Sequence, residues 1–263
     1  MPLSLPKGPQ RIVCLTEEPT EILYALGEGD RVVGISAYTV RPPEAQAEKP
    51  VVSAFLDGSL KKIQALEPDL VIGFSDIQAK LAAKLIRANL PVLIFNQRSL
   101  EEIFEVIVAI GSLVGQREKA LELVRGRIQH IEAVQNESAR QAYRPRVYFE
   151  EWNDPMITAI QWVHELIEIA GGQNVFATLS TQKGAMDRVV TAEQVVEAQP
   201  EVYLASWCGA PFDRAEVEAR EGFSSLPALQ SNRVHEIPPE IILQPGPACL
   251  SDGLDCLVRC IRG

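Results

Sequence analysis

The sequence predicts an α/β protein with two parallel-sheet lobes of similar topology, joined by one long α-helix. Apolar, strand-like runs alternate with helical patterns along the whole chain. A polar, helix-forming run separates two such series, and the series contain matching segments: LKKIQALEPDLVIGF from Leu60 and AEQVVEAQPEVYLAS from Ala192. We therefore expect an N-terminal lobe over residues 1–112, a linking helix over 113–142 and a C-terminal lobe over 143–263.

The linking helix is predicted from composition and spacing. The run from Leu113 to Arg140 is rich in Glu, Lys, Arg, Gln, Ala and Leu and contains no proline. Gly126 costs this helix about 1 kcal/mol relative to Ala without ending it, and the end comes before Pro145, because a residue that precedes proline avoids helical angles. Apolar side chains recur three or four positions apart, at Leu121, Val124, Ile128, Ile131 and Val134.

Each lobe is predicted to contain a βαβ series, in which the crossovers make the strands parallel. The N-terminal series has strands at 11–15, 31–35, 70–73 and 92–95, an extended stretch from 51 to 55, and helices at 20–26, 59–66, 77–88 and 100–113. The C-terminal series has strands at 146–149, 202–205 and 233–237, and helices at 160–170, 192–198 and 250–261, with loop and helix over 211–223.

Composition argues against several classes of protein. The net charge is −10 with no basic stripe, which argues against nucleic acid as a partner. No apolar run of 18 residues could span a membrane. The segment MPLSLPKGPQ carries no secretory signal, so the sequence as written predicts a cytoplasmic protein, or a periplasmic one if a leader has been removed. Five cysteines without a regular framework predict free thiols instead of disulfides.

Aromatic residues mark a candidate binding surface. Ligands of parallel α/β sheets bind beyond the carboxyl ends of the strands. Any single aromatic there more often belongs to the core, but several of them in two lobes favour a shared apolar cleft for a bulky, partly apolar ligand. The aromatic residues at or just past predicted strand ends are Tyr38, Phe55, Phe74, Trp152 and Trp207.

Carboxylates occur at the same strand ends, at Glu17, Glu18, Glu150, Glu151 and Asp187. They could act as acid–base groups or bind a metal or a cationic group. Alternatively, Glu17 and Glu18 simply favour a helix N-terminus. No catalytic signature accompanies them: the Gly27-Glu-Gly29 sequence precedes a strand instead of following one, and His130, His164 and His235 are scattered. We expect neither an enzyme nor a metal site.

Five stretches resemble one known family: RIVCLTEEPTEILYALG, VVGISAYTVRPPEAQ, LKKIQALEPDLVIGF, ELIEIAGGQNVF and VVTAEQVVEAQPEVYL. The resemblance is to the periplasmic-binding-protein family with a helical backbone between its lobes, which serves ABC importers of cobalamin, siderophores, haem and metals. The chain is most similar to the cobalamin-binding members. The resemblance implies a monomeric substrate-binding protein that holds a cobalamin-like corrinoid in an aromatic interlobe cleft, with no catalysis and no cofactor besides the ligand. The alternatives are a ferric siderophore, haem or another metal chelate as ligand, or a cytoplasmic enzyme or regulator that reuses the fold.

The resemblance also implies a ligand-binding set. The aromatic positions that grip cobalamin in this family match Tyr38, Phe55, Phe74 and Trp152. A family tryptophan is replaced by Asp187 or its neighbour Arg188, and a family Asp and Arg are replaced by Glu240 and Gln244. We expect Glu17, Glu18, Glu151 and Gln244 to orient polar groups of the ligand. The full candidate set is Thr16, Glu17, Glu18, Tyr38, Phe55, Phe74, Glu151, Trp152, Asp187, Arg188, Trp207, Glu240 and Gln244.

The family docks on the membrane subunits of its importer through one glutamate in each lobe. Glu193 matches the glutamate of the second lobe, whereas Lys61 stands at the corresponding position of the first. A lysine that faces the importer's arginines turns an attraction into repulsion. This replacement predicts that ordinary docking is weakened at the first lobe.

Overall fold

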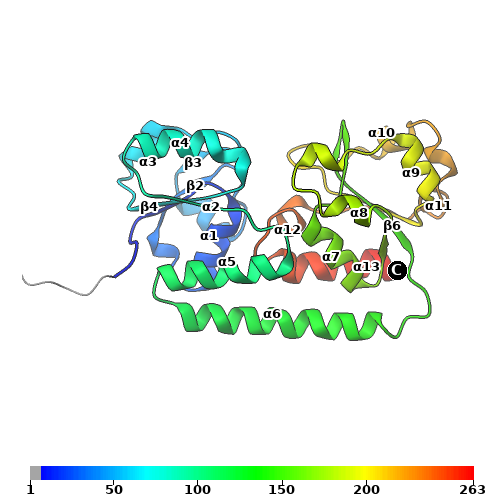
Figure 1. Ribbon diagram of the computed structural model, residues 1–263, viewed down its shortest axis with the longest axis horizontal. Coiled ribbons are helices and arrows are strands. Elements are labelled where there is room, and N and C mark those ends of the chain that lie inside the picture. The colour runs from blue at the N-terminus through cyan, green and yellow to red at the C-terminus, as the bar shows by residue number, and fades with distance from the viewer. Residues whose placement is uncertain (1–6) are drawn as a thin grey trace, which may run out of the picture. The chain divides into compact units, whose positions relative to one another are not determined.

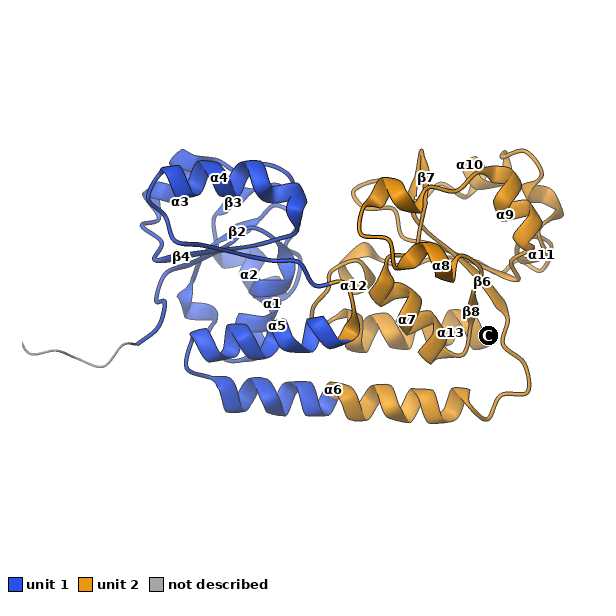
Figure 2. Cartoon of the chain, in the orientation of Figure 1, with its two compact units in different colours: residues 1–97, 101–126 blue, residues 98–100, 127–263 orange. Residues whose placement is uncertain are grey.

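The computed structural model describes residues 7–263 and divides them into two compact units. Unit 1 extends to Gln97 and includes Glu101–Gly126; unit 2 comprises Arg98–Leu100 and Arg127–Gly263 (Figure 2). Residues 1–6 lie outside the described residues. They belong to the segment MPLSLPKGPQ, on which the expectation about the cellular compartment rests. Within residues 7–263, no helix combines the length and the apolar character needed to cross a membrane.

Within the described residues, unit 1 contains a five-stranded sheet of order β3-β2-β1-β4-β5, in which each neighbouring pair is parallel. Helices cover both faces of this sheet (Figure 1). The strands are β1 (Ile12–Cys14), β2 (Val32–Ser36), β3 (Val51–Ser53), β4 (Leu70–Phe74) and β5 (Val92–Phe95). The helices are α1 (Glu17–Ala25), α2 (Pro43–Glu48), α3 (Leu60–Ala65), α4 (Ala79–Arg87) and α5 (Leu100–Leu113), with 3-10 turns η1 (Gly29–Arg31) and η2 (Asp76–Gln78).

The strands of unit 1 follow the predicted apolar runs, and their side chains form its core. Val13, Leu15 and Val71 pack with Ile63 of α3 and Leu85 of α4. Burial of these side chains drives the sheet and the helices together, at about 25 cal/mol per Å² of apolar surface. This core therefore holds α3 and α4 against the sheet.

The first helix starts earlier than predicted. α1 begins at Glu17, three residues before the expected start at Thr20. Pro19 lies in the first turn, where its missing N–H has no helical partner to lose. Thr16 is the N-cap residue, and both acidic residues that follow it belong to the first turn.

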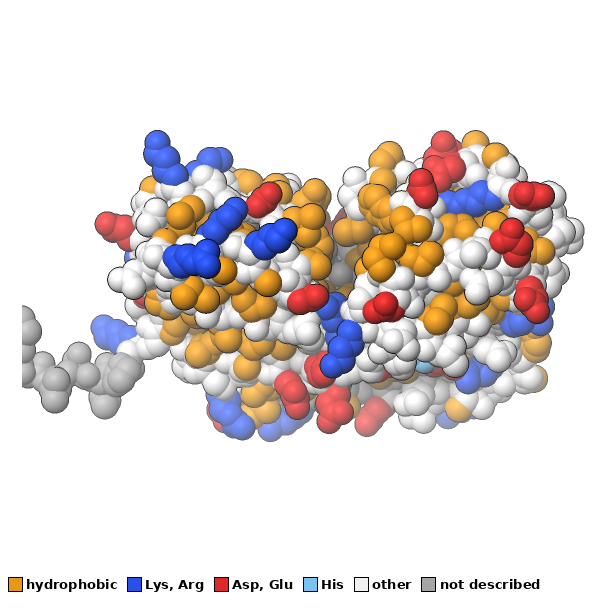
Figure 3. Space-filling model, turned by 45° about the horizontal axis from the view of Figure 1, so that its top comes forward, with side chains coloured by type: hydrophobic (Ala, Val, Ile, Leu, Met, Phe, Trp, Pro, Cys, Tyr) orange, Lys and Arg blue, Asp and Glu red, His pale blue; other side chains and the backbone are white. Residues whose placement is uncertain are grey.

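The outer helices of unit 1 carry a basic surface (Figure 3). α3 and α4 contain no acidic residue. Their exposed cations are Lys61, Lys62, Lys80, Lys84 and Arg87. The sequence analysis did not identify this surface, because the cations are divided between two helices.

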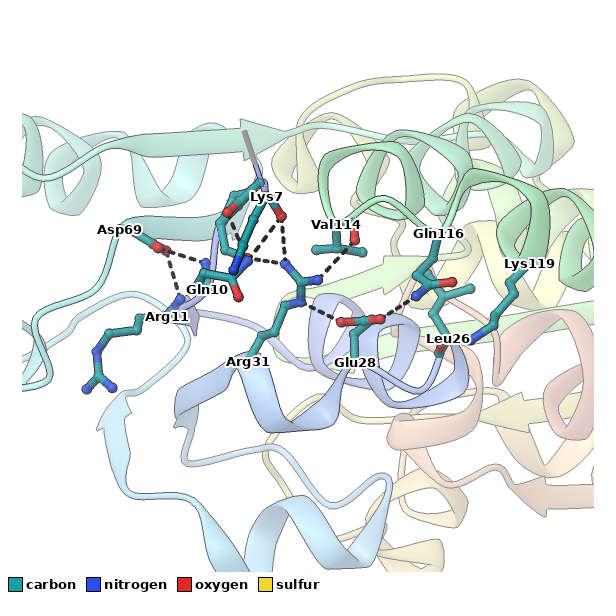
Figure 4. A network of polar contacts seen from close by, with 12 residues as sticks. Lys7, Gln10, Arg11, Leu26, Glu28, Arg31, Asp69, Val114, Gln116 and Lys119 are labelled. Carbon is teal, nitrogen blue, oxygen red and sulfur yellow. Dashed lines mark hydrogen bonds and ion pairs between the residues drawn. The ribbon is translucent and has the colours of Figure 1, made fainter. Parts of the chain in front are cut away.

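A polar network anchors the start of the described chain in unit 1 (Figure 4). The guanidinium of Arg31 is paired with Glu28 and donates to the carbonyl of Pro9 over 2.7 Å and to that of Val114 over 3.2 Å. Gln116 donates to the second carboxylate oxygen of Glu28 over 2.5 Å. One ion pair thus joins the N-terminal segment, η1 and the turn after α5.

Within the described residues, unit 2 contains a sheet of order β10-β9-β6-β7, with β8 also paired to β6. β6 pairs with β8 and β9 in parallel, but with β7 antiparallel. The prediction of parallel-sheet lobes is confirmed, but it did not include the antiparallel edge strand β7, which forms where β6 extends past its predicted end and turns back. The strands are β6 (Arg146–Asn153), β7 (Met156–Thr158), β8 (Gln173–Asn174), β9 (Val202–Ala205) and β10 (Val234–Glu236).

The helices of unit 2 include several short ones that the sequence analysis did not predict. Longer helices match predictions, for example α7, which ends at Gly171 in the left-handed conformation. The helices are α7 (Gln161–Ala170), α8 (Ala177–Ser180), α9 (Ala192–Ala198), α10 (Arg214–Glu218), α11 (Pro227–Gln230), α12 (Pro239–Ile242) and α13 (Leu254–Arg262), with 3-10 turns η3 (Ala185–Arg188) and η4 (Phe223–Ser225) and a π-helical turn η5 (Cys249–Gly253).

The long helix α6 spans Arg117–Ser138, inside the range expected for the linking helix. It begins in unit 1 and continues into unit 2 (Figure 2). α5 ends at Leu113, and Gly115 separates the two helices with a φ of 76°, a conformation that glycine adopts without strain. The predicted apolar face of α6 is buried at Val124, Ile131 and Val134, but the prediction is wrong at Ile128, which is exposed.

The internal repeat predicted from the sequence is present in the structure. In unit 1, Ser59 caps α3, and β4 follows and pairs parallel with β1. In unit 2, Thr191 caps α9, and β9 follows and pairs parallel with β6. The two units therefore share a topology around their first strands.

Candidate functional site

In unit 1, the predicted site residues lie beyond the carboxyl ends of the parallel strands. Thr16 and the two glutamates follow β1, Tyr38 follows β2, Phe55 follows β3 and Phe74 ends β4. Since the strands are parallel, these residues belong to one edge of the sheet. The structure therefore gathers the unit 1 candidates as the strand pattern predicts.

Gln78, which the sequence analysis missed, ties these strand ends together. Its Oε1 accepts a hydrogen bond from the backbone N–H of Phe74 over 3.0 Å, and its Nε2 donates to the carbonyl of Phe55 over 2.9 Å. Nε2 also lies 3.5 Å from the carbonyl of Leu15. The side chain is fully buried, so each of these bonds is shielded from water. No sequence motif distinguishes this glutamine from a surface residue.

The three aromatic candidates of unit 1 differ in exposure. Tyr38 is 48% exposed, Phe55 is half-buried and Phe74 is buried. Tyr38 thus offers the largest accessible ring at this edge. The Phe74 ring is instead part of the buried interior at this edge, and its backbone N–H donates to Gln78.

Glu17 and Glu18 are buried in the first turn of α1. Thr16 donates its hydroxyl to Glu18 Oε1 over 2.9 Å, and within residues 7–263 neither Glu17 Oε2 nor Glu18 Oε2 has a hydrogen-bond partner. Burial raises the pKa of Glu17 to about 7, and burial together with the charge of Glu17 raises the pKa of Glu18 to about 8. Near neutral pH Glu18 therefore keeps its proton, and this carboxyl can donate as well as accept a hydrogen bond.

In unit 2, Glu150 is the centre of a buried polar network. Its Oε2 accepts from Arg220 Nη1 over 2.7 Å and from the Tyr148 hydroxyl over 2.9 Å, and its Oε1 accepts from Trp207 Nε1 over 2.9 Å. Arg220 also lies over the ring of Phe223, 5.6 Å from its centroid. Burial raises the pKa of Glu150, and the guanidinium opposes that shift. Glu150 therefore holds the segment after β9 onto the sheet.

Trp207 does not meet the expectation of a ring exposed at a strand end. It is 2% exposed and belongs to the hydrophobic core of unit 2, where its ring packs against Phe212 at a centroid distance of 5.2 Å. Trp152, by contrast, is half-buried, and its Nε1 donates to the carbonyl of Asp154 over 2.8 Å. Trp152 is thus the candidate tryptophan that unit 2 leaves accessible.

Glu151 and Arg188 are brought together, although 37 positions separate them. Arg188 Nη1 lies 2.6 Å from Glu151 Oε2, and the same nitrogen donates to the carbonyl of Thr158. Arg188 is 1% exposed, whereas its neighbour Asp187 is exposed. The pair joins β6 to η3 beside the antiparallel strand β7. Because Glu151 is engaged by a buried cation, it is poorly suited to act as a free acid–base group.

Glu240 and Gln244 lie on and just after α12, not at a strand end. Glu240 is half-buried and Gln244 is buried. α12 is held to α7 by Trp162, whose Nε1 donates to the carbonyl of Ile242 over 2.9 Å.

The described residues contain no group of three or more His, Cys, Asp or Glu side chains that could hold a metal ion. Two hollows in unit 2 are lined by residues outside the predicted set. One is lined by Glu201, Pro227, Gln230, Ser231 and Arg233, another by Arg144, His164, Glu168, Gln173, Asn174 and Ala177.

The two residues expected to contact an importer occupy equivalent helix positions. Lys61 and Glu193 are each the second residue of a helix with a capped N-terminus, and both are exposed. Thr191 hydrogen-bonds to Glu193 and lowers its pKa. Lys61 belongs to the basic surface of α3 and α4, while Glu193 shares its helix with the exposed Glu197.

Comparison with known proteins identifies the class of protein to which this chain belongs. The family model described as "Periplasmic binding protein" matches residues 12–241. The chain belongs to the periplasmic binding protein family, whose members bind solutes without transforming them, and it is a substrate-binding protein of the class that serves ABC importers.

Two relatives show how far the similarity extends. An uncharacterized ABC transporter substrate-binding lipoprotein, YvrC, of Bacillus subtilis is 28% identical over 98% of this chain and 82% of its own length. A vitamin B12-binding protein of Vibrio campbellii is 31% identical over 92% of this chain and 86% of its own length.

Solved structures agree with the fold. The periplasmic heme-binding protein RhuT from Roseiflexus sp. RS-1 has a TM-score of 0.80 at 25% identity, covering 97% of this chain and 100% of its own. The periplasmic vitamin B12 binding protein BtuF of Vibrio cholerae has a TM-score of 0.77 at 25% identity, covering 98% of each chain.

Proposed function

We propose that this substrate-binding protein binds a cobalamin-like corrinoid. The observation that carries the proposal is the set of accessible aromatic side chains at strand ends in both units: Tyr38 and Phe55 follow β2 and β3 in unit 1, and Trp152 lies in the last two residues of β6 in unit 2. Flat rings give a flat macrocycle a large apolar contact at low cost in conformational entropy. The vitamin B12-binding relative from Vibrio campbellii supports this choice. That Tyr38 and Phe55 of unit 1 contact the same ligand molecule as Trp152 of unit 2 stays a prediction.

Glu17 and Glu18 supply a second argument for this ligand class. A corrinoid carries amide side chains, whose carbonyl groups accept hydrogen bonds. Carboxyls that keep their protons near neutral pH can donate to such acceptors without bringing an uncompensated charge into the site. The unpartnered oxygens of Glu17 and Glu18 are suited to this role.

The direct test is titration of the purified chain with cobalamin, followed by the visible spectrum of the ligand and by tryptophan fluorescence. We expect saturation at one ligand per chain with a dissociation constant of about 1 μM or lower, or about −8 kcal/mol. Tyr38→Ala and Trp152→Ala should each weaken binding roughly 10- to 100-fold, as expected for aromatic anchors. Tyr143→Ala, which alters an exposed tyrosine bonded to Glu201, is the matched control and should bind normally. Flat titrations, or equal binding by all three variants, would overturn the proposal.

Haem is the second candidate ligand, and Tyr38 is the observation that favours it. A tyrosine oxygen can ligate haem iron, and this side chain is accessible beyond β2. The haem-binding neighbour RhuT supports including it. Titration with haemin distinguishes the two candidates: binding of haemin but not cobalamin, with a Soret band that changes in Tyr38→Phe, would replace the corrinoid proposal.

We also propose that Glu193 contacts the membrane subunits of an ABC importer, whereas Lys61 weakens the contact of unit 1. In reconstituted importer from the same host, Glu193→Gln should lower the ATPase stimulation that this protein provides, and Lys61→Glu should raise it. Glu197→Gln, one turn further along α9, is the control. Equal stimulation by Lys61→Glu and the unchanged protein would remove Lys61 from this role.

A further inference from the structure

Two cysteines lie one turn apart near the end of the chain, away from the strand ends described above. Cys256 and Cys260 are on α13, four positions apart, so their side chains share one face of the helix. Both are half-buried and therefore within reach of small molecules, and their thiols hydrogen-bond to each other. Both are free cysteines.

The surroundings of the pair are cationic. Arg259 lies between the two cysteines in the sequence, and its charge acts on both thiols. Arg233 Nη2 donates to the carbonyl of Cys260 over 3.3 Å and to that of Ile261 over 2.7 Å, which fixes a second guanidinium beside the last turn. Nearby positive charge favours a thiolate over a thiol.

The pKa values agree with this environment. The hydrogen bond from Cys260 lowers the pKa of Cys256 to about 6, while the same bond raises the pKa of Cys260. Cys14 provides the contrast inside the same chain, because burial raises its pKa to about 12. Of these thiols, Cys256 is the one prepared to react.

Helix geometry decides what kind of product the pair can form. A disulfide needs Cβ atoms about 3.5–4.5 Å apart, whereas residues one turn apart on a helix have Cβ atoms about 5–6 Å apart. Closing a disulfide would therefore unwind the last turn of α13. A single bridging atom with two bonds of about 2.3 Å, the length of a metal–sulfur bond, spans sulfurs up to about 4.6 Å apart and leaves the helix intact.

We propose that Cys256 and Cys260 form a two-thiol site that is bridged by soft, bifunctional electrophiles of the trivalent arsenical class. With hydrated phenylarsine oxide, each sulfur forms one As–S bond and each displaces one hydroxide from arsenic. The two thiol protons leave with the two hydroxides as two water molecules. No atom is oxidised or reduced, so the step needs no further reactant.

The test uses phenylarsine oxide with the intact protein. We expect one equivalent to bind per chain, with the mass of the adduct recorded by native mass spectrometry. Cys256→Ser and Cys260→Ser should each weaken binding at least about 100-fold, because a single thiol loses the chelate. Cys208→Ser, which removes a half-buried thiol outside α13, is the matched control and should bind as the unchanged protein does.

A second readout uses the unchanged protein, so it holds even if a variant fails to fold. After treatment with phenylarsine oxide, both α13 cysteines should resist alkylation by iodoacetamide while Cys208 is labelled at its usual rate. Protection of only one of the two, or binding that survives in Cys256→Ser, would overturn the proposal. Corrinoid titration of Cys256→Ser should be unchanged, so this inference and the proposed function fail or succeed separately.

Discussion

Arg220 Nη1 lies 2.7 Å from Glu150 Oε2, where the carboxylate is fully buried in unit 2 and the arginine side chain is 13% exposed. Removing one partner of a buried pair leaves the other charge without compensation and costs about 3–5 kcal/mol. We expect Arg220→Met to lower the free energy of unfolding in urea by that amount. The double variant Glu150→Gln/Arg220→Met should recover most of the loss, since both charges are then absent.

The control for this prediction is an exposed pair of the same kind. Arg214 Nε lies 2.6 Å from Glu218 Oε1 on α10, in contact with solvent. Arg214→Met should change the free energy of unfolding by about 0.5 kcal/mol or less. A large loss there, or none in Arg220→Met, would contradict the role assigned to Glu150.

The buried carboxyls of α1 predict how stability depends on pH. The folded chain holds the protons of Glu17 and Glu18 up to pKa values of about 7 and 8, whereas the unfolded chain releases them near 4.5. Between these values the folded state binds more protons, so stability falls as pH rises through this window. The shift of Glu18 corresponds to a loss on the order of 5 kcal/mol.

Urea unfolding at pH 5 and pH 8.5 measures this loss. Glu18→Gln cannot ionise, so the difference between the two pH values should shrink in this variant. Glu122→Gln, at an exposed position of α6, should leave the difference as it is. Stability that is level or rising over this range would show that the two carboxyls are not buried in the folded state.

The two candidate tryptophans of unit 2, Trp152 and Trp207, should behave differently when replaced. Trp207 donates to Glu150 inside the core, so Trp207→Phe should lower the free energy of unfolding by about 1–3 kcal/mol through an unsatisfied carboxylate. Ligand affinity should stay within about twofold, an energy of about 0.4 kcal/mol. Trp152→Phe should have little effect on stability, because the ring is half-buried and its N–H reaches only a carbonyl at an exposed turn. Denaturation and ligand titration of the same samples check both parts.

Two glycines of the linking region form a matched pair. A Cβ at Gly126 or at Gly115 would meet no atom within 4 Å, so neither substitution is limited by space. Gly126 is inside α6, where alanine should raise the free energy of unfolding by about 0.5–1 kcal/mol. Gly115 has a φ of 76°, so alanine at this position should lower the free energy of unfolding by about 1 kcal/mol. Thermal unfolding of both variants tests the prediction, which fails if the two changes have the same sign.

Much of the fold could be predicted from the sequence because its signals are local. β5 and β9 were predicted at their observed bounds from short apolar runs. The repeat was visible because each copy carries a proline and an acidic residue between helix and strand. The antiparallel strand β7 was missed, since three residues after a turn carry too little periodicity to be recognised.

The candidate site was predictable only in part. Residues at strand ends could be named, because parallel strands bring their carboxyl ends to one edge. Gln78 could not be identified from the sequence, because its three backbone partners belong to segments up to 63 positions away. The pairing of Glu151 with Arg188 was missed for the same reason.

The sequence by itself determined the order of the longer helices and the main parallel strands, the repeat and the family, because apolar spacing, capping residues and prolines act within a few positions of the chain. Only the tertiary structure decided which of the similar residues are available to a ligand. Trp152 and Trp207 both lie close to the carboxyl end of a strand, yet Trp207 is buried in the core of unit 2 and bonded to Glu150. Glu18 keeps its proton because packing removes water from its carboxyl, and that depends on contacts between distant segments of the chain.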